Sequence, residues 1–391
     1  MPQPLKLKDW CLIGSLAFGL GLAAPHIRTW LSTHSAPTEQ PDETATAPIS
    51  SDSFSLKLLH AALQSTPEGN LLLLPDCLAA LLQQIKYQAS DEVATELAGI
   101  APPEQWQRSS SDIRGAACLF ADVPYSAEAE AQGVISTPYS QNPAIAIATI
   151  NNTLQAYTSR TLGQMITGDD ISPDTTAIAA IAFTCTAEWA APIRQADSKA
   201  ADFYNANGSI PRILFMQAQA QHYAEAPSGE WKAACIRLAG TRTPAGIPPC
   251  DLIVIMPGHH SARPFAAALT QEQFSTIRTA LREAPANGSI EIPRLEFGGP
   301  AQNLRPLLQQ LGQEKLLTSS VPFSKLTSKE PFALSTMLAK YHIALKETRQ
   351  PDAAPANDSP ALLRCDKPFL WFLMPLSSPH APYAMGIVEN L

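Results

Sequence analysis

Residues 332–373 read FALSTMLAKYHIALKETRQPDAAPANDSPALLRCDKPFLWFL and predict two strands on either side of a long loop. In the first segment Tyr341, Ile343 and Leu345 alternate with smaller or more polar neighbours. This period of two is typical of a strand with one buried face. The next 21 residues, 348–368, include four prolines, and the apolar run 369–374 then predicts a second, buried strand. A loop of this length inside a folded domain is uncommon unless it has a function or is disordered.

The segments on both sides of this loop resemble the C-terminal part of the serpin family. The likeness is carried by Glu347, by the small-residue run 352–356, and by the segments 367–372 and 385–390. Further segments are similar to the family in the same order along the chain, at 54–59, 69–75, 89–97, 177–193, 202–211, 235–238, 252–257, 290–297 and 304–317. The resemblance covers residues 54–391.

The resemblance implies an α+β, serpin-like fold with a large central, mostly antiparallel sheet, smaller sheets and surrounding helices. Two spacings are shorter than in the family. Sixteen residues separate Ile100 from the strand-like segment 117–120, and the stretch 121–150 is also short. We therefore expect some helices to be shortened or missing.

The resemblance also implies a mechanism to test against the residues. In inhibitory serpins a protease cleaves the loop as a substrate, and the loop then inserts into the central sheet as an extra strand. The matching hinge is Arg349, Gln350, Pro351, Asp352, Ala353, Ala354 and Pro355, and it starts with Arg349 where inhibitors have glycine. A proline inside a sheet cannot donate its hydrogen bond and costs about 3 kcal/mol or more. Asp352 would enter the core without a partner. The hinge therefore predicts a protein that has lost insertion.

Two further sites follow from the resemblance. Inhibitors hold the central strands together with a hydrogen-bonded cluster of serines, an asparagine and a histidine. The matching positions, here called the shutter positions, carry the apolar residues Leu74, Cys77, Ile181 and Ala339. By contrast, the top-of-sheet cluster, which consists of Trp189, Arg294 and Glu347, matches the family's tryptophan and ion pair.

Two counts place the bond that a protease would cleave. Counting forward from Arg349 with the family's spacing gives Leu363–Arg364, and counting back from the strand at 367 gives Asn357–Asp358. The counts differ by six residues, so the loop is about six residues shorter than in an inhibitor. Leu363 and Arg364 form the candidate scissile region, because a trypsin-like protease would select Arg364. The alternative role for Arg364 is a solvated residue at a strand end.

The N-terminus resembles an export signal. Lys6 and Lys8 precede fifteen uncharged, mostly apolar residues, 10–24, as in the n-region and h-region of a signal sequence. Residues 1–31 are predicted to be a signal peptide or a retained signal-anchor. Residues 32–52 are rich in Ser, Thr, Pro and acidic residues and predict a flexible linker. The serpin domain is expected at 53–391, outside the cytoplasm: secreted, periplasmic, or anchored by the N-terminal segment.

Composition excludes several other functions. The chain has 391 residues, 45% of them hydrophobic, and a net charge of −8 without a basic cluster. These values predict a substantial core and argue against nucleic acid as a partner. Membrane contact is expected only through the N-terminal segment. The sequence contains none of the common nucleophile, phosphate-loop or zinc motifs, so we predict no enzyme activity, no cofactor and no metal site. His259 and His260 are interpreted as part of a solvated turn.

Cysteines leave several alternatives open. Six remain after Cys11, and in an exported chain they allow fifteen disulfide connectivities or buried free thiols. The resemblance puts Cys118 and Cys185 on neighbouring strands and so suggests one possible pair.

The sequence therefore predicts a monomeric, non-inhibitory serpin-family protein that acts as a binding module for a partner, through its loop or its surface. The alternative is an inhibitor of serine or cysteine endopeptidases that works through the loop.

Overall fold

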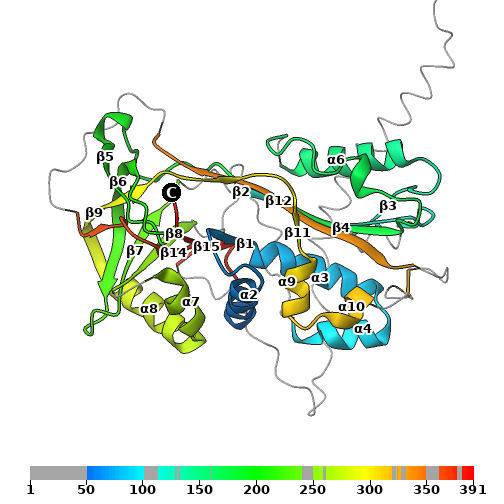
Figure 1. The fold of residues 1–391 in the computed structure, drawn as a ribbon, viewed down its shortest axis with the longest axis horizontal. Coiled ribbons are helices and arrows are strands. Elements are labelled where there is room, and N and C mark those ends of the chain that lie inside the picture. Colours follow the sequence, from blue (N-terminus) through cyan, green and yellow to red (C-terminus); the bar gives the residue numbers. More distant parts are fainter. Residues whose placement is uncertain are drawn as a thin grey trace, which may run out of the picture.

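The computed structural model describes residues 51–100, 113–127, 130, 133–158, 160–239, 250–258, 261–318, 323, 325–326, 332–348, 361–376 and 381–391. Their strands form two sheets with helices packed around them (Figure 1). The fold class is α+β, as the resemblance implied. In the described part of the chain, no helix is both long enough and apolar enough to cross a membrane.

The first sheet has nine strands and is mostly antiparallel. Its order is β1 (Leu71–Leu73), β15 (Ala384–Val388), β14 (Phe369–Met374), β8 (Asp251–Pro257), β7 (Trp231–Arg237), β6 (Arg212–Glu225), β9 (Pro285–Pro293) and β13 (Leu363–Arg364), and β5 (Lys199–Asp202) pairs with β6.

The second sheet has six strands and carries the long strand before the loop. Its order is β10 (Leu295–Gly298), β12 (Leu334–Leu345), β4 (Ala177–Cys185), β2 (Ile113–Ala121) and β3 (Val134–Ser136), and β11 (Gln302–Asn303) pairs with β12. Strands β12 and β4 run parallel to each other, in a ladder from Leu334↔Ala177 to Ile343↔Cys185.

The helices are short to medium in length. They are α2 (Ser51–Ser65), α3 (Pro75–Gln88), α4 (Asp91–Glu96), α6 (Pro143–Tyr157), α7 (Ala262–Ala268), α8 (Gln271–Glu283), α9 (Arg305–Gln310) and α10 (Glu314–Thr318), with 3₁₀ turns at Leu97–Gly99, Gly168–Asp170 and Gln195–Asp197. Helix α6 shows how the sequence sets a helix start. The Asn142 side chain accepts a hydrogen bond from the backbone N–H of Ile145, and Pro143 occupies the first turn.

Helices cover the six-stranded sheet on both faces. Helix α6 lies on one side, and α2, α3 and α9 lie on the other (Figure 1). Ile178, Ala180 and Ala182 pack with α6, whereas the alternate residues Ala179 and Ile181 pack into the main core. This arrangement explains why all nine residues of β4 are buried. The unbroken apolar run 177–183 predicts a strand that is covered on both faces.

The predicted alternation on β12 is only partly correct. Ile343 and Leu345 are buried, but Ala344 is also buried and Tyr341 is half-buried. The period of two is broken because neighbouring elements cover parts of both faces of this strand, and burial then no longer reports one face alone.

The predicted loop is too long at its C-terminal end. Leu363–Arg364 forms strand β13, which pairs in parallel with Ile290 and Glu291 of β9. At the other end Thr348 is buried. The expectation of an unbroken loop from 348 to 368 is therefore wrong. Residues 349–360, with the hinge residues, lie outside the described residues, as do His259 and His260.

The structure also corrects the expected linker boundary and the suggested cysteine pair. Helix α2 begins at Ser51, so Ser51 and Asp52, which we expected to end the linker, belong to the helix. The described cysteines are all free. Cys118 lies opposite Ala180, whereas Cys185 lies opposite Ile113, so the two thiols are five residues apart along the ladder, or about 17 Å. The suggested Cys118–Cys185 pair is therefore wrong. Residues 1–50, with the predicted signal, lie outside the described part, as do 101–112.

Candidate functional site

The top-of-sheet residues meet at the C-terminal end of β12. The Glu347 carboxylate accepts hydrogen bonds from Arg294 Nε at 2.9 and 2.6 Å, one to each oxygen. Ser198 Oγ donates to the same carboxylate at 2.6 Å. The carboxylate is 6% exposed and the arginine side chain 37%. Ser198, which the sequence did not single out, completes the set because the turn before β5 carries it to the end of β12.

Hydrogen bonding keeps Glu347 ionised. Burial raises the pKa of this carboxyl group, but the hydrogen bonds from Arg294 and Ser198 outweigh that effect and lower the pKa below its usual value. A charged carboxylate in this position holds the end of β12 to two other segments of the chain.

Trp189 and Thr348 fix the same point through the backbone. Trp189 is 2% exposed, and its indole Nε1 donates to the carbonyl oxygen of Lys346 at 3.0 Å. The Thr348 N–H donates to the carbonyl of Ile193 at 2.8 Å, and Thr348 Oγ1 accepts from the Ile193 N–H at 3.1 Å. The structure thus brings all three predicted top-of-sheet residues together at the start of residues 349–360.

The far end of the segment is also fixed. Leu362 N–H donates to Ser289 O, and Cys365 N–H donates to Glu291 O, each at 2.8 Å. Leu363 is 3% exposed, and Arg364 forms an ion pair with Glu291. A protease binds its substrate in an extended form that it must surround, so the bond Leu363–Arg364 is accessible to it only after β13 leaves β9.

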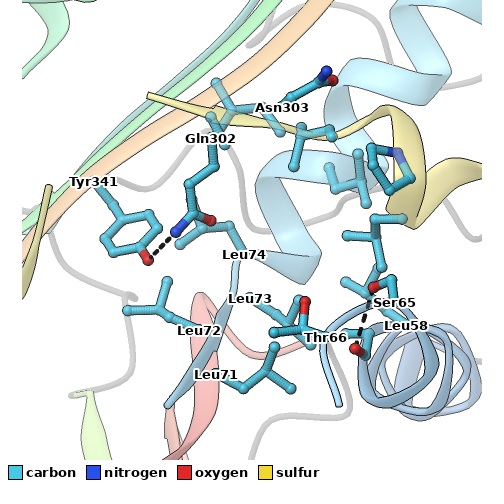
Figure 2. A pocket seen from close by; sticks show the side chains of 17 residues that line it. Leu58, Ser65, Thr66, Leu71, Leu72, Leu73, Leu74, Gln302, Asn303 and Tyr341 are labelled. Atoms are coloured by element: carbon cyan, nitrogen blue, oxygen red, sulfur yellow. Dashed lines mark hydrogen bonds between the residues drawn. The ribbon is translucent and has the colours of Figure 1, made fainter. Parts of the chain in front are cut away.

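The shutter positions converge on one cavity. Leu74, Ile181 and Ala339 line a cavity of about 180 Å³ between the six-stranded sheet and the helices below it (Figure 2). Cys77, the fourth position, is 1% exposed in the first turns of α3. Burial raises the pKa of its thiol well above the usual value, so Cys77 stays protonated and unreactive.

The sequence did not predict the contact between Gln302 and Tyr341 in this cavity. Gln302 Nε2 donates to Tyr341 Oη at 2.8 Å along one wall (Figure 2). These two residues are 39 positions apart, and no local pattern joins them, because the contact depends on the pairing of β11 with β12.

Among the described residues, no group of three or more His, Cys, Asp or Glu side chains could hold a metal ion. The contacts around Glu347 hold the end of β12 to Arg294 and Ser198.

Comparison with known proteins finds solved structures with the same fold. Solved structures with the same fold include Manduca sexta serpin-12, with 20% identity, coverage of 88% of this chain and 98% of that one, and a TM-score of 0.73. Human glycosylated kallistatin follows with 16% identity, coverage of 88% and 97%, and a TM-score of 0.72. Native protease nexin-1, solved with heparin, shares 17% identity, with coverage of 87% and 98% and a TM-score of 0.70.

At these identities the structural neighbours show the fold alone, and none of the curated proteins matches this sequence. The family model described as "Serpin (serine protease inhibitor)" matches residues 125–391, more than half of the chain. The chain therefore belongs to the serpin family.

Proposed function

We propose that this serpin is a non-inhibitory binding protein, which presents the segment 349–360 and the surface around it to a protein partner. The observation that carries the proposal is the distance an inserted strand would have to cover, which the register of β12 and β4 defines. In this proposal the protein is not an enzyme, needs no cofactor and acts as a monomer.

An inserted strand would start after Thr348, whose backbone is hydrogen-bonded to Ile193. A strand that turned back after Thr348 and inserted between β12 and β4 would run antiparallel to β12. The ladder between β12 and β4 ends at Leu334, fourteen residues before Thr348. Cleavage after Asn357 would free nine residues, 349–357, which reach about as far as Ala339. The lower part of the gap would stay unfilled.

The other predicted cleavage point supplies enough length but is held in a sheet. Cleavage between Leu363 and Arg364 would free fifteen residues, yet this bond lies in β13, paired with β9. Cleavage there requires β13 to unpair and the Arg364–Glu291 ion pair to break. The pairing of β13 with β9 therefore supports the proposal, because the cleavage point that frees enough residues lies inside a sheet.

The residues of the hinge also oppose insertion. Pro351 and Pro355 lack the N–H that a central strand donates, and Asp352 would carry a charge into the sheet, which costs free energy unless the charge is paired. The apolar shutter positions add to this cost, because separating β4 from β12 would expose Ile181 and Ala339 to water.

A protease panel tests the proposal. The purified full-length protein is mixed with trypsin, chymotrypsin, elastase, subtilisin and papain, and the products are separated under denaturing conditions. We expect cleavage fragments and active protease, without any denaturant-resistant complex. A covalent complex with any of these proteases, together with stoichiometric loss of its activity, would establish the alternative, an endopeptidase inhibitor.

The placement of the protein outside the cytoplasm belongs to the same proposal and is supported by the lysine-flanked apolar segment 10–24. A reporter enzyme that is active only in the cytoplasm, fused after Ser53, should give no signal. The same reporter fused to a chain without residues 2–31 serves as the control and should be active. Activity of the first fusion would show that the segment does not export the domain.

A further inference from the structure

The cavity at the shutter positions has the features of a built binding site. We propose that it binds a small, neutral, monocyclic molecule that carries one hydroxyl group. This inference does not depend on whether the loop inhibits proteases.

The roof of the cavity is a row across three strands. Gln302 of β11, Ala339 of β12 and Ile181 of β4 are register partners in turn, and Tyr341 lies two residues beyond Ala339 on the same strand. The small side chain of Ala339 stands at the centre of this row, where a larger residue would fill the space. The floor comes from other elements, with Leu58 of α2, Leu72 of β1 and Leu307 of α9 among its residues.

The size of the cavity selects the ligand class. The space measures about 180 Å³ and opens toward solvent beside Gln302 and Asn303, which are exposed. An apolar cavity of about 150 Å³ accommodates benzene. A single six-membered ring with one or two substituents therefore fits, and a fused polycyclic molecule does not.

The wall chemistry favours a neutral ligand that carries a polar group. The polar side chains of the lining are Ser65, Thr66, Gln302, Asn303 and Tyr341, and Gln302 and Tyr341 form a hydrogen-bonded pair on one wall. None of the described side chains that line the cavity is charged, and an ion would lose its hydration without gaining a partner. The Gln302 amide already donates to Tyr341 Oη. The Tyr341 hydroxyl keeps its own hydrogen to donate, and Gln302 Oε1 remains an acceptor. A ligand hydroxyl can accept from the first and donate to the second, as Figure 2 shows both side chains on the same wall.

Binding would also act on the sheet. The ligand would lie between the roof strands β12 and β4 and the floor elements α2, β1 and α9. It would thus contact both of the strands that must separate for insertion. A molecule that binds only this folded state raises the unfolding temperature by mass action.

The probe for the test is 4-fluorophenol, with fluorobenzene as the matched compound that lacks the hydroxyl. Fluorine NMR of each compound with the full-length protein measures the dissociation constant, and thermal unfolding with each compound is followed in parallel. We expect 4-fluorophenol to bind the wild-type protein at millimolar or lower concentration, several-fold more tightly than fluorobenzene, and to raise the unfolding midpoint.

Three variants locate the site. Tyr341→Phe should weaken 4-fluorophenol about fivefold, the effect of one hydrogen bond, and leave fluorobenzene within twofold. Ala339→Val should abolish binding of both compounds by filling the cavity. Tyr223→Phe, which removes a hydroxyl bonded to Glu225 on a distant strand, is the control and should change neither.

If Ala339→Val fails to fold, Leu307→Phe fills the same cavity from α9 and gives the same readout. The proposal is wrong if neither compound binds the wild-type protein, if a folded cavity-filling variant still binds as the wild type does, or if Tyr341→Phe affects the two compounds equally.

Discussion

Asp76 is a buried carboxyl group in the first turn of α3, next to the shutter position Cys77. It is 2% exposed, and burial raises its pKa from 3.8 to about 7. Its folded-state pKa thus lies above its unfolded value. The unfolded chain releases this proton near pH 4 and the folded chain holds it to about pH 7, so stability falls as pH rises between these values and is constant above them.

The first prediction follows from this sign. Asp76→Asn removes the titrating group. The free energy of unfolding of this variant, minus that of the wild type, should therefore increase as pH rises from 5 to 7 and stay constant above pH 7. The expected gain is on the order of one to several kcal/mol, since each pKa unit corresponds to about 1.4 kcal/mol. Urea unfolding at pH 5, 6, 7 and 8 measures it. The exposed Asp174 provides the control, and Asp174→Asn should show no such trend. A gain that is equal at all four pH values would contradict the role of burial.

The second prediction concerns Glu347, whose pKa is shifted the other way. Glu347→Gln should destabilise the protein by about 1–3 kcal/mol at pH 7, because it removes charge-assisted bonds to a nearly buried group. Since the folded pKa is lowered, this stability is present above the unfolded value and is lost as pH falls through the folded one. The difference from the wild type should therefore shrink below about pH 4.

A double-mutant cycle isolates the pair. Arg294→Gln combined with Glu347→Gln should show a coupling energy above about 1 kcal/mol. The exposed pair Arg212–Asp202, at 3.8 Å, is the matched control and should show a coupling near zero after Arg212→Gln and Asp202→Asn. Equal coupling in the two cycles would mean that the top-of-sheet cluster is no stronger than a surface ion pair.

At the scale of elements, strand β13 decides which bonds of the loop region a protease can reach. Its two residues pair with β9, and the backbone groups on either side of them also bond to β9. Proteases cleave backbone that leaves such pairing easily. The bond after Arg349 lies outside this pairing in the sequence, between Thr348 and the first loop proline.

The third prediction is therefore an order of cleavage. Limited trypsin treatment should cut after Arg349 before it cuts after Arg364, as mass spectrometry of the earliest fragments would show. Glu291→Gln removes the ion pair of Arg364 and should speed cleavage at Arg364 several-fold without changing the rate at Arg349. Early, selective cleavage after Arg364 in the wild type, with a stable protease adduct, would restore the inhibitor hypothesis.

At the scale of the whole molecule, the question is whether the six-stranded sheet can accept another strand. Insertion requires β12 and β4 to separate along a parallel ladder that is buried over most of its length. The new ladder would contain Pro351, Asp352 and Pro355, and the nine residues 349–357 would reach only to Ala339, five residues short of Leu334. The native sheet should therefore stay as it is after cleavage.

The fourth prediction measures this directly. Protein cleaved after Arg349 or within 350–360 should melt within a few degrees of the intact protein, since no strand is added to the sheet. Scanning calorimetry of intact and cleaved samples gives the two midpoints. A cleaved form that melts tens of degrees higher would mean that the loop inserts despite Pro351, Asp352 and Pro355.

Much of the fold could be predicted from the sequence because it depends on local pattern and on order along the chain. The apolar runs 177–183 and 369–374 predict buried strands, and both are buried throughout. The order of matched segments identifies the family. Trp189, Arg294 and Glu347 were found through the resemblance, and they lie together in the structure.

The tertiary structure alone decided the features that depend on contacts between distant segments. Leu363–Arg364 looks like the end of a loop until β9 supplies a partner strand. Tyr341 looks like a core position until Gln302, 39 residues away, bonds its hydroxyl. The cavity beside Ala339 exists because four strands and three helices meet around a small side chain. A sequence determines which residues prefer to be buried, but the space left between them is set by the packing of elements that only the folded chain brings together.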